Sequence, residues 1–389
     1  MASQTSTPRP RSRVRLLTAV ALTLGTVGAL AAAGPSGAVG GPPGGDHGFR
    51  ERDLVSDLAN RAEVQDKNLQ NPWGLVRTTD GSIRVSNNGT STSTVYSGAR
   101  DDRPVVVGSP VVQLPDNADP TGVVRNDTDE FRFSSTPSGK THPARFIYAG
   151  ENGGLFAFNP RVLPTQAVQV AQEDDAVFKG LTLVDSEKRE TKQHGHRQPR
   201  ILVANFRDAR IDVFGTDFKL IPQPAGAFQD PSLPPGFAPF DVKNIGDRIF
   251  VTYALQNADK HDDVAGPGNG FINVFSTKGK LLQRFASGGV PTSPLNSPWG
   301  LEVAPKKFGK FGGDLLVGNF GDGRIHAFDL RTGRFEGTLD NPAGQPIVIN
   351  GLWGLQRGTA KSGGENSVWF AAGINDEQDG LLGTLRAER

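Results

Sequence analysis

Short apolar stretches that end in polar turns recur along most of the chain. The clearest copies are IRVSNNG, RFIYAGENGG, ILVANFRDA, IFVTYALQN, LLVGNFGDG and VWFAAGIND, which begin at residues 83, 145, 201, 249, 315 and 368. Each copy is short and rich in β-branched and aromatic residues, so the pattern predicts β-strands rather than helices. Further short strands follow most copies, for example FINVFS at 271–276 and KLLQRFASG at 280–288.

A five-residue phrase precedes these strands and also repeats. The strongest copies are Asn71-Pro72-Trp73-Gly74-Leu75, Ser297-Pro298-Trp299-Gly300-Leu301 and Gly351-Leu352-Trp353-Gly354-Leu355, and weaker copies occupy 119–123, 177–181 and 237–241. Successive copies lie about 50–60 residues apart. This spacing accommodates about four short strands in each of six units.

Six such units predict an all-β fold, a six-bladed β-propeller of four-stranded blades. Residues 50–58 precede the first unit, while the last unit lacks a fourth strand. We therefore expect the N- and C-terminal strands to pair and close the ring, which removes an exposed sheet edge. Two stacked β-sandwich domains are the alternative, but they predict no regular six-fold period.

The first residues of the chain differ in character from the repeats. Four arginines between residues 9 and 15 precede an apolar run at 16–33, and small residues and a Gly/Pro tract follow it. This order is typical of a secretory signal peptide. We expect residues 1–38 to contain the signal peptide and the start of the linker, 39–49 to be a flexible linker, and 50–389 to be a single propeller domain.

The predicted location is therefore secreted, outside the cell, with no stable membrane anchor after cleavage. A transmembrane anchor is the alternative interpretation of the apolar run, because its 18 residues approach the length that spans a bilayer. The net charge of +1 depends on this segment, since removing it leaves 38 basic residues against 41 acidic ones. An acidic mature chain without a basic stripe argues against nucleic-acid binding.

Composition narrows the chemistry further. The 49 glycines and 28 prolines disfavour long helices and suit a fold with many turns. The chain has no cysteine, which excludes disulfides, thiol catalysis and cysteine-ligated zinc. The sequence also lacks a G-x-S-x-G elbow, a P-loop, an H-E-x-x-H helix and a dinucleotide-binding fingerprint.

Polar residues occupy similar places after the second strand of successive units. In a closed propeller these turns lie at one end of the barrel, so their side chains can converge on the axis. Carboxylate and amide oxygens are the ligands that Ca²⁺ prefers. The candidate metal ligands are Glu151, Asn205, Asn319 and Asp376. The alternative is that these residues only build hairpin turns.

An insertion at 257–270 interrupts the fourth unit and concentrates acids around one histidine. His261 and Asp262 are the candidate catalytic residues, because such a loop can bring acid–base groups over the mouth of the barrel. A solvated charged loop is the alternative. A second irregular stretch, 187–200, is basic and contains His194 and His196; it is most simply an exposed hairpin loop.

The repeated tryptophans allow two interpretations. Trp73, Trp299 and Trp353 are candidate ligand-stacking residues, but they can equally serve to pack the blades. The adjacent glycines permit a turn or a close approach between backbones.

The phrases NPWGL, SPWGLEVAP, LLVGNFGDGRI, YALQNADKHDDVAGPGNGF, GLWGL and AGINDEQDGL resemble an uncharacterised family of secreted bacterial proteins with NHL-like propeller repeats. The resemblance extends from about Leu54 to Leu385. It implies a propeller and export, and it brings no established activity. The basic stretch at 187–200 is longer than the family pattern implies.

The function that these observations favour is a scaffold that binds an extracellular ligand or protein, and we expect a monomer. The alternative is a calcium-dependent hydrolase of the lactonase or esterase type. In that case an axial metal would polarise a carbonyl while His261 or Asp262 moved the proton. A structural role in the cell envelope is a third possibility.

Overall fold

The computed structural model describes residues 48–101, 103–185 and 198–388. The predicted signal peptide and most of the predicted linker lie outside the described residues, as do His194 and His196. Within the described part, almost every regular element is a β-strand, and we find no helix with the length and apolar character that crossing a bilayer requires. The described residues belong to one compact unit.

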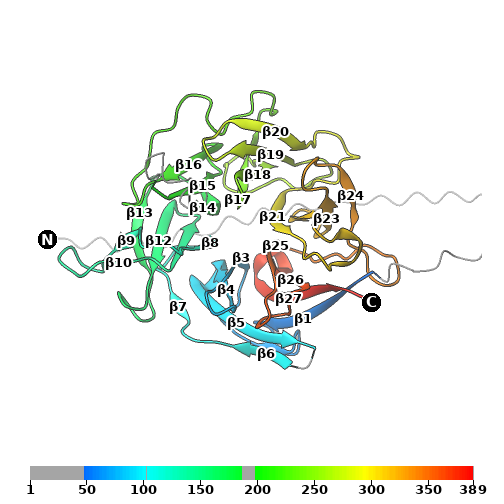
Figure 1. Cartoon of the computed structure of the whole chain (residues 1–389), viewed down its shortest axis with the longest axis horizontal. Coiled ribbons are helices and arrows are strands. Elements are labelled where there is room, and N and C mark those ends of the chain that lie inside the picture. The colour runs from blue at the N-terminus through cyan, green and yellow to red at the C-terminus, as the bar shows by residue number, and fades with distance from the viewer. Residues whose placement is uncertain (1–47, 102, 186–197, 389) are drawn as a thin grey trace, which may run out of the picture. The chain divides into compact units, whose positions relative to one another are not determined.

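The strands form six antiparallel sheets arranged around an axis as the blades of a propeller (Figure 1). From the axis outward, the first blade contains β3 (Pro72–Arg77), β4 (Ile83–Asn87), β5 (Thr92–Arg100) and β6 (Arg103–Val107). The second blade contains β8 (Pro120–Arg125), β11 (Phe146–Gly150), β12 (Gly154–Phe158) and β13 (Val168–Gln172). The next two contain β14 (Phe178–Val184), β15 (Arg200–Asn205) and β16 (Arg210–Phe214), then β17 (Phe237–Ile245), β18 (Arg248–Leu255), β19 (Phe271–Ser276) and β20 (Leu281–Ala286).

The fifth and sixth blades complete the ring. They contain β21 (Pro298–Val303), β22 (Leu315–Asn319), β23 (Ile325–Phe328) and β24 (Phe335–Thr338), then β25 (Leu352–Arg357), β26 (Ser367–Gly373), β27 (Asp379–Ala387) and β1 (Phe49–Ser56). The minor elements are β2 (Val64–Gln65), β7 (Val112–Gln113), β9 (Arg132–Phe133), β10 (His142–Pro143), η1 (Asn88–Thr90), η2 (Gly309–Phe311) and α1 (Ile374–Glu377). The outer edge of the third blade is reduced to one bridge between Phe214 and Leu220. The predicted six-bladed propeller is confirmed.

The first described strand closes the ring. Strand β1 pairs antiparallel with β27, from Phe49 opposite Ala387 to Ser56 opposite Leu381. The last blade therefore takes its outer strand from the N-terminal side of the chain, as the sequence predicts. This pairing joins the two ends of the propeller and covers the edge that β27 would otherwise expose.

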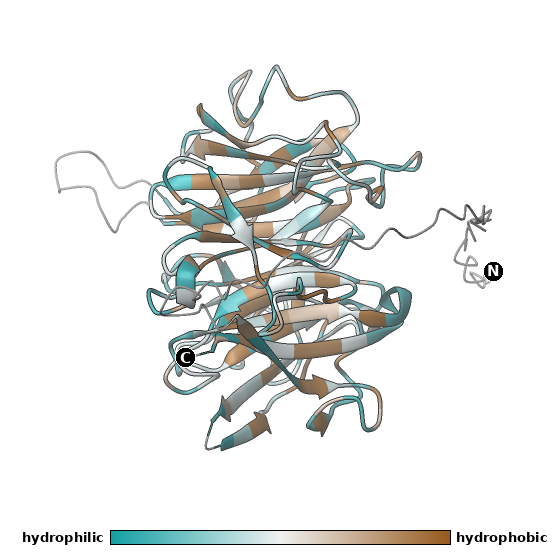
Figure 2. Cartoon of the chain, turned by 90° about the vertical axis from the view of Figure 1, so that its right-hand side faces the viewer, coloured by the Kyte–Doolittle hydropathy of each residue, from teal (hydrophilic) through white to brown (hydrophobic). Residues whose placement is uncertain are grey.

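Apolar side chains fill the spaces between neighbouring blades. On β15, Ile201 and Val203 pack with residues of the second blade, while Leu202 and Ala204 pack with residues of the fourth. Because successive side chains of a strand point to opposite faces, both faces of this strand are buried. This explains why the second strands are continuous apolar runs rather than alternating ones. Figure 2 shows hydrophobic positions distributed through the stacked strands of the propeller.

The glycines of the repeated phrase let the innermost strands approach one another. A Cβ atom at Gly354 would lie 2.4 Å from the carbonyl oxygen of Trp73 in the next blade. One at Gly300 would lie 2.4 Å from the carbonyl oxygen of Trp353, and one at Gly74 would lie 2.8 Å from that of Thr121. The repeated glycine therefore serves close packing around the axis.

We predict that Gly354→Ala destabilises the protein because the added methyl group meets a neighbouring backbone that cannot move alone. We expect urea denaturation to show a loss of about 1–3 kcal/mol in the free energy of unfolding, the usual cost of overpacking. Gly215→Ala is the matched control, since the nearest atom to its Cβ is a carboxylate oxygen of Asp217 at 3.1 Å on a flexible side chain. Equal effects of the two substitutions would contradict this explanation of the repeated phrase.

Candidate functional site

The three predicted tryptophans lie together in a buried aromatic cluster at the axis. Their exposed fractions are 2% for Trp73, 4% for Trp299 and 1% for Trp353. Trp73 stacks on Trp353 with ring centroids 3.4 Å apart and planes inclined by 17°, and Trp299 meets both rings edge-on. Phe320 stacks on the Trp353 ring at 3.9 Å. This arrangement supports the packing interpretation, while ligand stacking stays a prediction.

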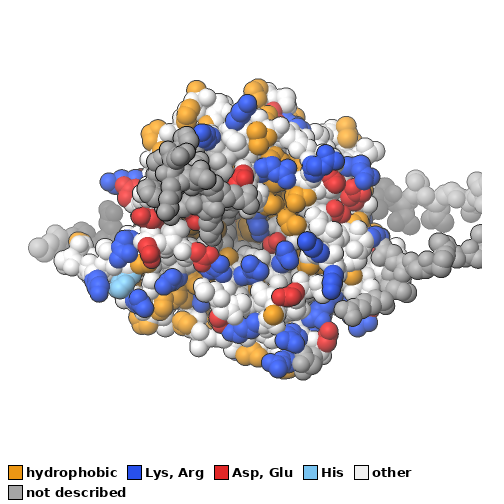
Figure 3. Space-filling model, viewed as in Figure 1, with side chains coloured by type: hydrophobic (Ala, Val, Ile, Leu, Met, Phe, Trp, Pro, Cys, Tyr) orange, Lys and Arg blue, Asp and Glu red, His pale blue; other side chains and the backbone are white. Residues whose placement is uncertain are grey.

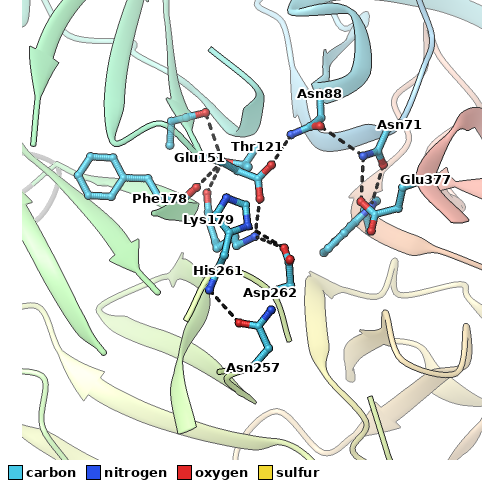
Figure 4. Close-up of polar contacts among 12 residues, drawn as sticks. Asn71, Asn88, Thr121, Glu151, Phe178, Lys179, Asn257, His261, Asp262 and Glu377 are labelled. Carbon is cyan, nitrogen blue, oxygen red and sulfur yellow. Dashed lines mark hydrogen bonds and ion pairs between the residues drawn. The ribbon is translucent and has the colours of Figure 1, made fainter. Parts of the chain in front are cut away.

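Charged side chains from several blades converge beside this aromatic cluster. We call Glu151, Lys179, His261, Asp262 and Glu377 the axial cluster. Figure 4 shows Glu151, Lys179, His261 and Asp262 pointing toward one another, with Glu377 joined to them through Asn71 and Asn88. Glu151 follows β11 and Glu377 ends α1, so two of the turns after second strands meet at one end of the axis.

Lys179 lies at the centre of the axial cluster. It belongs to the innermost strand β14, is 1% exposed, and forms an ion pair with Glu151. Its Nζ atom is 3.8 Å from Oδ1 of Asp262 and 5.0 Å from the centre of the Trp73 ring. Burial alone would lower the pKa of the Lys179 amine, but the neighbouring carboxylates outweigh burial and hold the pKa above its ordinary value. Lys179 is therefore a fixed ammonium ion.

A chain of amide hydrogen bonds connects the axial cluster to the aromatic cluster. The Asn88 Nδ2 atom donates to Oε2 of Glu151 at 2.9 Å, and the Asn71 Nδ2 atom donates to Oε2 of Glu377 at 2.9 Å. Asn71 also donates to Oδ1 of Asn88 at 3.3 Å and accepts a bond from the Trp353 indole at 3.2 Å. These bonds fix both carboxylates relative to the floor of the site.

His261 and Asp262 form a hydrogen-bonded pair at the opening of the site. The two side chains meet at 2.8 Å between Nδ1 and Oδ1, and the backbone N–H of His261 donates to Oδ1 of Asn257 at 3.0 Å. The bond to Asp262 raises the pKa of His261, since it favours the protonated imidazole. Burial raises the pKa of Asp262, but the His261 bond and the Lys179 charge bring it below its ordinary value.

Glu377 owes its position to an unusual turn. Asn375, Asp376 and Glu377 adopt φ values of 55°, 54° and 62°, so three consecutive non-glycine residues lie in the left-handed region. This conformation costs free energy and persists only where surrounding contacts hold it, often at functional sites. The turn directs Glu377 toward Asn71, and burial together with the charge of Glu151 raises the pKa of Glu377 to about 7.

The structure brings together some of the predicted site residues and separates others. Glu151, His261 and Asp262 meet in the axial cluster. Asn205 and Asn319 are buried and bond within their surroundings, to Asp212 at 2.8 Å and to the carbonyl of Pro294 at 2.8 Å respectively. Asp376 is exposed, and we find no hydrogen bond or ion pair from it to the cluster within the described residues. Metal binding by these three residues stays a prediction.

Three side chains could together hold a metal ion. Ligand atoms of Glu151, His261 and Asp262 all lie within 4.8 Å of one another. The ammonium of Lys179 pairs with the same Glu151 carboxylate, and it would repel a second positive charge. The arrangement therefore fits a metal only if Lys179 moves aside.

The sequence analysis missed Lys179 and Glu377. Lys179 occupies the position in Val177-Phe178-Lys179-Gly180-Leu181 that tryptophan holds in the strongest copies of the phrase, so the departure from the repeat was its signal. Glu377 directly follows the predicted Asp376. Only the left-handed turn decides which of these two adjacent acids faces the axis.

The raised pKa of Glu377 predicts a pH-dependent effect of Glu377→Gln. The folded state binds the Glu377 proton more tightly than the unfolded state, so ionisation weakens folding as pH rises from about 4.5 to about 7. We expect the variant to be more stable than the wild type by about 1–2 kcal/mol at pH 8 and equally stable at pH 4.5, in urea denaturation. Asp217→Asn, an exposed substitution on the third blade, is the control. Equal destabilisation by Glu377→Gln at both pH values would contradict the assignment.

Comparison with known proteins places the chain in a family. No family model matches it. Two uncharacterized proteins of Acanthamoeba polyphaga mimivirus are similar to it over 342 residues, at 31% and 30% identity; each alignment covers 85% of this chain, and the two cover 78% and 84% of the viral proteins. The α-L-arabinanase of Penicillium chrysogenum, solved with arabinobiose, has a TM-score of 0.51 at 12% identity and covers 87% of this chain and 98% of that chain, which shows the fold alone. The resemblance to secreted bacterial NHL-like proteins stays a prediction beyond the propeller itself. The chain belongs to the same family as the two mimivirus proteins.

Proposed function

We propose that the chain is a ligand-binding propeller that takes a small cation at the axial cluster. The observation that carries the proposal is an excess of carboxylates over cations around the axis. In the axial cluster the acids are Glu151, Asp262 and Glu377, and the bases are Lys179 and His261. Because a partly buried site screens charge poorly, this excess attracts a further positive charge.

The pKa values of two groups in the site indicate the same preference for positive charge. The pKa values of His261 and Glu377 both lie above their ordinary values, which means that each group holds a proton more tightly than it would in water. Burial contributes to the shift of Glu377, and the carboxylate of Asp262 contributes to that of His261. A cationic ligand near these groups would supply the positive charge that those bound protons otherwise supply.

An organic ammonium group fits this site better than a metal ion. Lys179 already shows that an ammonium group can be held between Glu151 and Asp262 over an aromatic ring. Ammonium groups and carboxylates form charge-assisted hydrogen bonds, and aromatic faces attract cations. Asp262 and Glu377 are the carboxylates that a ligand would meet without displacing Lys179.

A metal-dependent hydrolase is the second candidate function, and the close approach of Glu151, His261 and Asp262 is the observation that favours it. A divalent ion held there would supply Lewis-acid polarisation of a carbonyl. A His261 side chain that binds the ion through Nε2, with Nδ1 bonded to Asp262, would not also serve as the general base. Calcium in particular prefers six to eight oxygen ligands. The Oδ1 atom of Asn205 already accepts a bond from the backbone N–H of Asp208, whereas the buried Oδ1 atom of Asn319 has no hydrogen-bond partner within the described residues.

Calorimetric titration of the metal-stripped protein with ethanolamine hydrochloride, calcium chloride and manganese chloride tests the proposal. We expect the wild type to bind one of these cations, and we expect Asp262→Asn and Glu377→Gln each to weaken binding at least tenfold. Asp217→Asn should leave the affinity unchanged. Lys179→Gln should strengthen binding of a metal, because it removes a competing positive charge; its fold is checked by circular dichroism.

The choice of cation distinguishes the two candidate functions. Binding of ethanolamine alone supports the scaffold, whereas binding of a divalent ion alone supports the hydrolase. Absence of binding by all three cations up to millimolar concentration would contradict both. Binding that Asp262→Asn and Glu377→Gln leave intact would show that the cation binds elsewhere.

A further inference from the structure

A funnel opens at the opposite end of the axis from the axial cluster. It has a volume of about 850 Å³ and is lined by all six innermost strands, with Trp299 of the aromatic cluster among its lining residues. Figure 3 shows this face, where basic and acidic side chains both border the central hollow. The funnel holds none of the candidate residues of the axial cluster, so it is a separate site.

Three arginines stand at equivalent positions around the funnel. Arg77, Arg125 and Arg357 are the last residues of β3, β8 and β25, which belong to three consecutive blades, and all three line the funnel. They end the same repeated phrase, in the segments NPWGLVR, DPTGVVR and GLWGLQR. The repeat itself therefore sets guanidinium groups side by side along one wall.

Two of these arginines lack a neutralising partner. Arg125 pairs with Asp127 at 2.6 Å. For Arg77 and Arg357 we find no carboxylate partner within the described residues, and the Nε atom of Arg357 is buried without a hydrogen bond there. A guanidinium group beside a cavity offers a planar fork that matches a carboxylate or phosphate. This wall can therefore bind an anionic group through its guanidinium groups.

The opposite wall offers donors and acceptors of both kinds. Lys243 lies 3.3 Å from Oε2 of Glu302, and the Gln356 side chain of the adjacent strand β25 donates to the same oxygen at 3.1 Å. Asp241 lines the funnel beside them and is 7% exposed; burial raises the pKa of its carboxyl group to about 7. Such paired donors and acceptors suit hydroxyl groups, which donate and accept at once.

We propose that the funnel binds an anionic carbohydrate, whose acid group contacts Arg77 and Arg357 and whose hydroxyl groups contact Lys243, Glu302 and Asp241. The acid group is a carboxylate, as in a uronic acid, or a phosphate ester. A cavity of this volume accommodates one or two sugar rings. The proposal is independent of the cation site, because the buried aromatic cluster lies on the axis between the two.

Calorimetric titration with glucuronate, glucose 6-phosphate, glucose and inorganic phosphate at pH 7 and low salt tests this proposal. We expect glucuronate or glucose 6-phosphate to bind at least tenfold more tightly than glucose, and the affinity to fall as sodium chloride is added. The double substitution Arg77→Gln/Arg357→Gln should weaken binding at least tenfold. Arg331→Gln, at an exposed turn of the fifth blade, should have no effect. Glu302→Gln should weaken binding of the sugar acids without altering that of inorganic phosphate.

The outcomes distinguish a carboxylate ligand from a phosphate ester, and they show which results would overturn the proposal. Preference for glucuronate identifies a uronic acid, and preference for glucose 6-phosphate identifies a phosphate ester; both support the proposal. Binding of inorganic phosphate as tight as that of glucose 6-phosphate would overturn it, because the hydroxyl groups would then contribute nothing. Absence of binding by both sugar acids, or unchanged binding by the double arginine variant, would also overturn it.

Discussion

The stack of Trp73 on Trp353 is the contact on which the organisation of the axis depends. The two rings come from the first and last blades, where the ring closes, and their centroids are 3.4 Å apart. Close stacking is possible because Gly354 lets its strand approach the backbone of Trp73. With Trp299 and Phe320, the stack forms a buried aromatic floor, and aromatic contacts of this kind contribute more than their buried area alone.

The aromatic floor gives the two ends of the propeller different chemistry. On one side Lys179 lies over the Trp73 ring among carboxylates that outnumber it, so this end favours positive charge. On the other side Arg77 and Arg357 face a funnel whose lining carries both basic and acidic side chains, and these two arginines offer a local place for a negative group. Both sets of charges are placed by innermost strands or by the turns next to them. One repeated scaffold thereby presents two unlike sites.

The sequence predicts the fold well because each blade has the same local sequence pattern. Continuous apolar second strands and turn residues recur in all six units, the Trp-Gly phrase recurs in three of them, and the ring closure follows from the missing last strand. The site is harder to predict, because spacing shows which turns share an end but not which side chains face the axis. Asp376 and Glu377 are adjacent, and only the left-handed backbone of their turn determines that Glu377 rather than Asp376 faces the axis. The role of Lys179 is hard to predict from the sequence. A lysine in a buried strand is stabilised by carboxylates of other blades, and the sequence does not show which carboxylates lie beside it.

A double-mutant cycle on Trp73→Leu and Trp353→Leu tests most directly whether the stack joins the first and last blades. The measurement is the free energy of unfolding of the wild type, both single variants and the double variant in urea. We predict a coupling of about 0.5–1.5 kcal/mol between these residues, and none between Trp73 and Phe250, which packs in a separate cluster between the fourth and fifth blades. A coupling near zero for Trp73 and Trp353 would contradict the account.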